Sequence, residues 1–172
     1  MHIHLETERL RIAPLREEDA PFIYSLLNTK GWIEFIGNRN IFTDEDAVNY
    51  IRKINGSPGY FYNVFSDKNS GSAYGLVTFL FRSGHSLPDL GFAMLPQAEG
   101  KGYAYEAAEA YLRHLETEYA GMKISGITVP QNVKSIRLLE KLGFSYEGQR
   151  TEDNELLNVY TRLLVSSVEN KE

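Results

Sequence analysis

The chain has 172 residues, of which 42% are hydrophobic and 24% charged, a length and composition that suit one globular domain over residues 1–172. The net charge of −5 argues against a nucleic-acid partner, and the absence of cysteine excludes disulfides, a thiol nucleophile and thiolate metal sites. The opening MHIHLETERL lacks the apolar core of a signal peptide and no run resembles a membrane helix, so we expect a cytoplasmic protein with no membrane partner.

Six elements are predicted in the first half of the chain. Leu10 and Ile12 alternate with arginines, which indicates a strand over 5–15. A helix is expected over 19–27, and a second, capped by Thr43, extends to Ile54. Aromatic and β-branched runs then predict three strands, at 60–65, 74–82 and 90–95, of which the first two form a hairpin.

The second half alternates helices with strands. A helix follows the glycines near residue 100 and reaches Leu115, and another covers 135–142 before Gly143 ends it. Strands are expected at 123–129, 144–148 and 157–164. The order β-α-α-β-β-β-α-β-α-β-β predicts a mixed, mostly antiparallel α/β sheet of about seven strands flanked by four helices.

The stretch QAEGKGYAYEAAEAYLRHL, residues 97–115, combines a glycine-rich turn with an amphipathic helix. Gly100 and Gly102 flank Lys101 where the helix begins, so unpaired backbone N–H groups and a partial positive charge would stand free of side chains. Such a turn can cradle a phosphate, but it can also be an ordinary strand-to-helix connection. The helix has one apolar stripe of mostly small residues suited to close packing on a sheet: Ala104, Ala107, Ala108, Tyr111, Leu112 and Leu115.

Four motifs in the same order resemble the GCN5-related N-acetyltransferase (GNAT) family. They are LETERLxI at 5–12, DLGF at 89–92, QxxGxGxA at 97–104 and NxxSxxLLEKLGF at 132–144. The first is similar to the subgroup that acetylates protein N-termini, including those of ribosomal proteins. The resemblance extends from about residue 5 to residue 164 and implies the GNAT fold.

The resemblance implies acetyl-CoA as co-substrate, with no metal. Its pyrophosphate would rest on the amides of Gly100 to Ala104, and its pantetheine arm would pass between two splayed parallel strands at 92–95 and 127–129. Asn132 would hold that arm, although a helix N-cap explains it equally well, and Lys101 can equally be a solvated lysine. The implied cofactor-binding residues are Phe92, Ala93, Met94, Leu95, Gln97, Gly100, Lys101, Gly102, Tyr103, Ala104 and Asn132.

The chemistry implied is direct attack of a neutral amine on the thioester through a tetrahedral oxyanion, which a backbone N–H at Ala93–Met94 would stabilise. Asp89 is the candidate base, acting through water, or else an exposed carboxylate at a strand start. Many relatives carry a tyrosine as acid where this chain has Leu139, so Ser135 is the remaining candidate for that role. A hydroxyl satisfied locally in the first turn of a helix is the alternative for Ser135.

The acceptor is a primary amine, and the N-terminal resemblance favours a peptide or protein α-amine over a small-molecule amine such as a polyamine, amino-sugar or amino acid. Trp32 and Glu34 would form the lip of its pocket, and Tyr60 and Tyr62 would line one face of a strand beside it. Trp32 can equally belong to the core. A catalytically silent CoA-binding domain and a homodimer both remain open.

Overall fold

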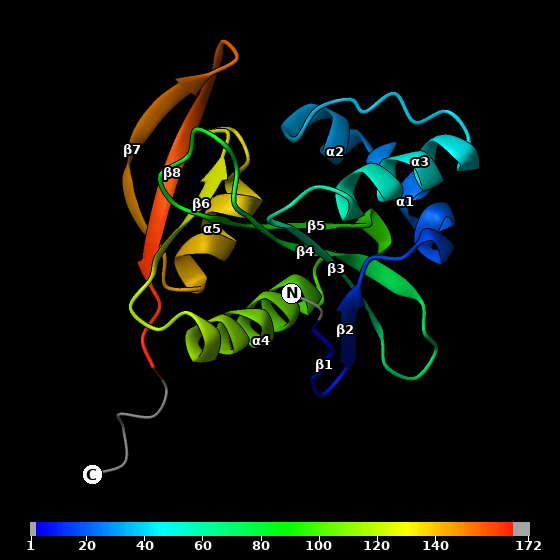
Figure 1. Cartoon of the computed structure of the whole chain (residues 1–172), viewed down its shortest axis with the longest axis horizontal. Helices are drawn as coiled ribbons and strands as arrows, with labels where there is room; N and C mark the ends of the chain where they lie inside the picture. The colour runs from blue at the N-terminus through cyan, green and yellow to red at the C-terminus, as the bar shows by residue number, and fades with distance from the viewer. Residues whose placement is uncertain (1–2, 167–172) are drawn as a thin grey trace.

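One mixed sheet organises the part of the chain that the structure, a computed structural model, describes: residues 3–166 (Figure 1). Within those residues eight strands lie in the order β1-β2-β3-β4-β5-β6-β8-β7. Only the β5–β6 pair among them is parallel. The strands are β1 (Leu5–Glu6), β2 (Leu10–Pro14), β3 (Tyr60–Asp67), β4 (Ala73–Leu80), β5 (Asp89–Met94), β6 (Lys123–Thr128), β7 (Ser145–Glu152) and β8 (Glu155–Leu163).

Helices cover both faces of this sheet (Figure 1). One apolar cluster lies under α1 (Ala20–Leu27), α2 (Lys30–Phe35) and α3 (Asp44–Asn55). The other lies under α4 (Tyr103–Glu118) and α5 (Val133–Lys141). Five of the six residues in the expected stripe of α4 are buried, and its small side chains bring the helix close to the strands. No helix within 3–166 is long and apolar enough to cross a membrane.

The predicted mixed, mostly antiparallel α/β fold is confirmed, but the numbers of strands and helices differ. The strand expected over 5–15 is two strands, because Thr7 turns the chain: its N–H donates to the Leu10 carbonyl and its hydroxyl accepts from the Leu10 N–H, both at 2.9 Å. The additional helix is α2. Thr29 caps it by accepting a hydrogen bond from the N–H of Trp32 at 3.2 Å.

The β7–β8 hairpin is longer than the sequence predicts. The expected strand stopped at Gly148, where the structure instead has a shift of register and β7 continues to Glu152. Glycine inside a strand often marks such a bulge. Asp153 and Asn154 form the two-residue turn in the left-handed region, with φ of +47° and +63°, as a tight hairpin requires.

Candidate active site

A cleft of about 400 Å³ lies over the middle of the sheet. Its floor is one face of β4 and β5. Alternate residues of each strand point to this face, and each lies beside its paired residue on the neighbouring strand. Leu80 pairs with Asp89, Thr78 with Gly91, and Leu76 with Ala93. Helix α2 forms one wall, while the end of β6, the start of α5 and the β7–β8 turn form the other.

The glycine of the DLGF motif keeps this floor open. A Cβ on Gly91 would lie 2.6 Å from the hydroxyl oxygen of Thr78, so any side chain there would force Thr78 to move. The register of β5 with β4 is one-to-one from Asp89 to Met94. A bulge therefore does not shorten the path from Asp89 to Ala93, and a strand rise of about 3.3 Å per residue keeps the two roughly 13 Å apart.

The parallel strands β5 and β6 separate soon after they begin. Their recorded pairing is at Asp89 and Ser125, where the Ser125 N–H donates to the Pro88 carbonyl at 2.9 Å. The backbone N–H and C=O groups of successive residues in a strand point alternately to its two neighbours. Because the Pro88 carbonyl points toward β6, those of Phe92 and Met94 also point toward β6. Both strands continue beyond this pairing, so these groups face the widening gap, where an extended ligand arm can pair with them as an added strand.

The other expected contacts along β5 are placed as follows. Phe92 and Ala93 line the cleft, as do Ile127 to Val129 across the gap. Leu95 donates its N–H to the Tyr74 carbonyl at 2.8 Å, so that amide is committed to β4. Gln97 is exposed in the short 3₁₀ helix Pro96–Ala98.

Asp89 is buried in the cleft floor and is not the exposed strand-start carboxylate that was the alternative. Its side chain is 5% exposed, and Arg82 lies against it, with Nε 3.0 Å from Oδ1 and Nη2 3.3 Å from Oδ2. Burial raises the pKa of Asp89 above its ordinary value, while the charges of Arg82, His85 and Arg150 oppose that rise. The result is a carboxylate that is easier to protonate than one in water.

The glycine turn before α4 has the backbone that only glycine adopts readily. Gly100 and Gly102 have φ of +76° and +78°, and Gly102 is the N-cap of the helix. A Cβ on Gly100 would meet no atom within 4 Å, so the conformation, not crowding, explains the glycine. Lys101 is exposed at the tip, and the ring of Tyr103 stacks on Tyr74 with 4.6 Å between centroids. Ala104 packs against the core.

The LETERL segment, residues 5–10, contacts the glycine turn and the first turn of α4. Arg9 donates from Nη1 to the Lys101 carbonyl at 2.9 Å and from Nε to Glu106 at 2.6 Å, and its guanidinium carbon lies 4.6 Å above the ring of Tyr103. Thr7 donates to the same carboxylate at 2.5 Å. Partial burial raises the pKa of Glu106, but the hydrogen bonds from Thr7 and Arg9 outweigh it and the pKa falls below its usual value.

At the start of α5, Asn132 and Ser135 both line the cleft. Asn132 is the N-cap: its side-chain oxygen accepts from the Ser135 N–H at 3.2 Å, which confirms the capping interpretation. The Ser135 hydroxyl makes no hydrogen bond with another described residue, so its role as an acid stays a prediction.

The expected acceptor residues divide into two pairs. Trp32 and Tyr62 line the cleft, and Trp32 is also part of the core, with 6% of its surface exposed. Burial raises the pKa of the Tyr62 hydroxyl, which stays neutral. Glu34 is exposed on α2 and Tyr60 packs against the core, and neither lines the cleft.

Sequence reasoning missed a charged cluster that joins the β4–β5 loop to β7. The side chain of His85 is 8% exposed, and its Nε2 lies 2.7 Å from a carboxylate oxygen of Glu152. Arg150 contacts the His85 ring at 2.9 Å and donates to Glu152 at 3.0 Å. The hydrogen bond from His85 is the largest cause of the lowered pKa of Glu152. In the described residues no group of three His, Asp or Glu side chains is placed to hold a metal ion.

Comparisons with known proteins agree with this geometry. The model of the acetyltransferase (GNAT) domain matches residues 9–145. A relative from Bacillus subtilis (strain 168), the uncharacterized N-acetyltransferase YnaD, is 27% identical over 146 residues, 85% of this chain and 85% of that protein.

Two solved structures share the fold. Ribosomal-protein-S5-alanine acetyltransferase from Vibrio fischeri has a TM-score of 0.78, 20% identity and coverage of 99% of this chain and 100% of that one. Spermidine N-acetyltransferase from Vibrio cholerae, in complex with CoA and spermine, has a TM-score of 0.77, 20% identity and coverage of 92% and 97%. Because the family model covers most of the chain, this protein belongs to the GNAT family and is an acetyl-CoA-dependent N-acetyltransferase.

Proposed function

We propose that the enzyme acetylates the α-amine of a peptide or protein N-terminus, which enters between α2 and the β7–β8 turn. The observation that carries the site assignment is the separation of β5 from β6. It leaves a gap beside the cleft that contains Asp89, and the pantetheine arm would reach this gap from the Gly100–Gly102 turn. The donor and the acceptor would thus approach the gap from opposite sides.

Each group in the cleft has a chemical role in this proposal. The amides of Gly100 to Ala104 hold the pyrophosphate at the N-terminus of α4. The N–H of Met94, turned toward the gap, donates to the oxyanion that forms when the amine attacks the thioester. Asp89 takes the ammonium proton through water before the attack, and Ser135 passes to the departing thiolate the second proton, which the nitrogen loses after it attacks, so that the serine hydroxyl is restored.

Two features of the cleft favour a polypeptide α-amine. Ile36, the C-cap residue of α2, is 42% exposed and lines the cleft with Trp32 and Phe35, and these apolar side chains suit the first residues of a peptide. Arg39 and Arg82 also line the cleft and would repel a polycation. An α-amine, with a pKa of about 8, also loses its proton more easily than a primary amine with a pKa near 10.4.

A polyamine acceptor is the second candidate, and the β7–β8 turn favours it. Glu152, Asp153 and Glu155 bring three carboxylates to the rim of the same cleft. Carboxylates so placed attract a ligand with several ammonium groups. The solved relatives act on acceptors of both kinds, one on a ribosomal protein and one on spermidine.

A turnover assay with acetyl-CoA separates these candidates. Peptides with free N-termini, the same peptides with the terminus blocked, spermidine and an amino-sugar should be compared at equal concentrations. We expect turnover of the free N-termini to exceed that of the other amines at least about tenfold in kcat/KM, since the apolar wall contacts only a peptide. Turnover of spermidine with none on any peptide would reverse the assignment.

The contacts of Arg9 predict a second result, on cofactor affinity. Arg9→Ala should weaken CoA binding about tenfold, because the turn loses its bonds to the Lys101 carbonyl and to Glu106 and must be ordered by the ligand. Arg11→Ala is the matched control, since Arg11 makes only a 3.4 Å surface contact with Glu6. Calorimetry measures both affinities, and equal values for Arg9→Ala and Arg11→Ala would show that the turn does not depend on Arg9.

A further inference from the structure

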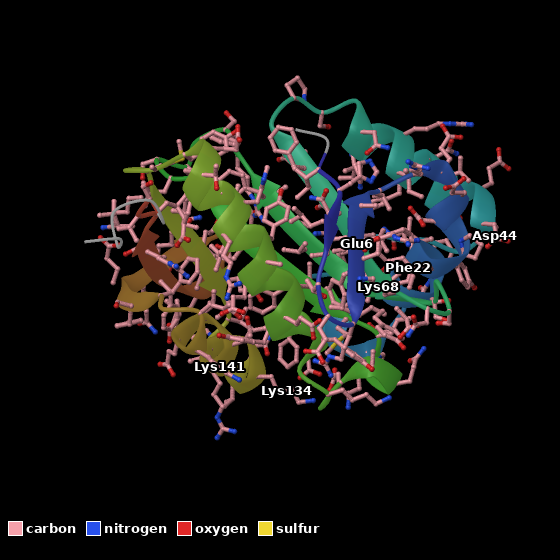
Figure 2. All side chains as sticks on the ribbon, turned by 90° about the horizontal axis from the view of Figure 1, so that it is seen from below. Glu6, Phe22, Asp44, Lys68, Lys134 and Lys141 are labelled. Atoms are coloured by element: carbon pink, nitrogen blue, oxygen red, sulfur yellow. The ribbon has the colours of Figure 1, made fainter. Side chains whose placement is uncertain are left out.

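A row of basic side chains runs along the exposed face of α5. Lys134, Arg137 and Lys141 follow one another at i, i+3 and i+7, the spacing of residues on one face of a helix. All three are exposed, and Figure 2 shows Lys134 and Lys141 at the rim of the molecule beside this helix. Such a concentration of positive charge is notable in a chain whose net charge is −5.

Both ends of this basic row contact the segments that flank the glycine turn. The ammonium group of Lys134 pairs with the carboxylate of Glu99, the residue before Gly100. The Nζ of Lys141 lies 4.2 Å from the ring centroid of Tyr105, in the first turn of α4. Arg137 lies between them along the helix and is exposed, on the same face by its spacing.

The charges on the other side of the turn are already paired. Arg9 is bound by Glu106 and the Lys101 carbonyl. Lys68 lies 3.1 Å from Glu6, and the two are neighbours in Figure 2. Lys134 is also paired, with Glu99, whereas Arg137 and Lys141 have no acidic partner among the described residues. An additional anion beside the turn therefore finds unpaired cations on α5 as well as at Lys101.

CoA carries such an anion at a fixed place. The ribose whose 5′ oxygen bears the pyrophosphate also bears a phosphate monoester on its 3′ oxygen. With the pyrophosphate on the amides of Gly100 to Ala104, that monoester lies one sugar away from the turn. It carries a charge of about −1.5 to −2 at neutral pH, and a guanidinium can bind it with two parallel hydrogen bonds.

We infer that Lys134, Arg137 and Lys141 form the binding site for the 3′-phosphate of CoA, by which the enzyme discriminates CoA from dephospho-CoA. This inference rests on the proposed pyrophosphate site and names a further contact of the same cofactor. When CoA binds, the Lys134 ammonium group contacts the phosphate in place of Glu99 or together with it. The planar guanidinium of Arg137 donates two parallel hydrogen bonds to the phosphate.

The test is calorimetric affinity for CoA and for dephospho-CoA, which lacks only the 3′-phosphate. Exposed charge pairs each change an affinity by about two- to fivefold, so three of them predict that the wild type binds CoA about tenfold tighter. In the triple variant Lys134→Gln, Arg137→Gln, Lys141→Gln the ratio of the two affinities should fall to about one to two. Lys53→Gln, on α3 at the opposite face of the sheet, is the control and should keep the wild-type ratio.

Three outcomes decide the matter. Equal wild-type affinities for the two ligands would overturn the 3′-phosphate site and leave the pyrophosphate site intact. A tenfold ratio that persists in the triple variant would overturn the assignment to α5. Binding of neither ligand by the folded wild type would instead overturn the proposed cofactor site. Each single variant should lower the affinity ratio by part of the total. Arg137→Lys should retain part of the ratio, because lysine keeps the charge but lacks the planar guanidinium.

Discussion

Replacing Asp89 with asparagine is expected to lower kcat/KM by between about tenfold and ten-thousandfold, the range for a positioned acid–base group. Asparagine preserves the shape of the side chain and an oxygen that can accept from Arg82, but it cannot take a proton. The lower end of the range applies because Arg82, 3.0 Å from the carboxylate, makes Asp89 a weaker base than burial alone would. The roughly 13 Å between Asp89 and Ala93 makes the proton path indirect, through water.

The pH dependence distinguishes this role from a structural one. Burial raises the pKa of Asp89, so wild-type activity should fall as the pH drops through that raised value and the base becomes protonated. As the pH rises toward the pKa of the acceptor amine, free amine accumulates without help. The deficit of Asp89→Asn should therefore shrink with rising pH, whereas a variant that is merely misfolded would keep a constant deficit.

Asp44→Asn is the matched control, since Asp44 is an exposed aspartate in the first turn of α3, at the edge of the molecule in Figure 2. It should keep wild-type turnover. The affinity of Asp89→Asn for CoA should also be unchanged. Full turnover by Asp89→Asn at neutral pH, with that affinity intact, would remove Asp89 as the base and leave proximity as the source of catalysis.

Local signals account for most of what the sequence predicted. Gly100 and Gly102 have the positive φ that their residue type suggests, and Asn132 caps α5 as asparagine before a helix commonly does. The fold followed from the order of the elements. The errors in it are also local: Thr7 divides a strand, and Gly148 marks a bulge where an end was expected.

Contacts between distant residues could not be read from the sequence. Arg9 and Glu106 are separated by 97 positions, and His85 and Glu152 by 67. No period or spacing links such residues, because only the pairing of strands brings them together. The sequence placed Asp89 at the head of a strand, but its ion pair depends on Arg82, which lies beyond the end of β4. The LETERL motif could be recognised as a family feature, but its contacts with the glycine turn could not be predicted from the sequence.

Replacing Gly102 with aspartate is expected to abolish CoA binding and yet leave the protein folded. The substitution adds strain at φ +78°, although aspartate is among the residues that tolerate this region best. Its Cβ would lie 3.5 Å from an Arg9 nitrogen, an ordinary contact, and a carboxylate near the N-terminus of α4 interacts favourably with the helix dipole. The variant should therefore unfold at about the wild-type temperature.

The same carboxylate should exclude the pyrophosphate. It accepts hydrogen bonds from the amides that the phosphates would use, and it places like charge beside them, a repulsion of about 4 kcal/mol at 4 Å for an effective dielectric constant of 20. We expect CoA affinity to fall at least about a hundredfold by calorimetry. Gly121→Asp is the control, because Gly121 has φ of +85° with no neighbour within 4 Å and lies beyond the far end of α4. It bears the same strain without the charge at the turn, so it should bind CoA normally. An unchanged affinity in Gly102→Asp would exclude the turn as the pyrophosphate site, since no phosphate can share those amides with a fixed carboxylate.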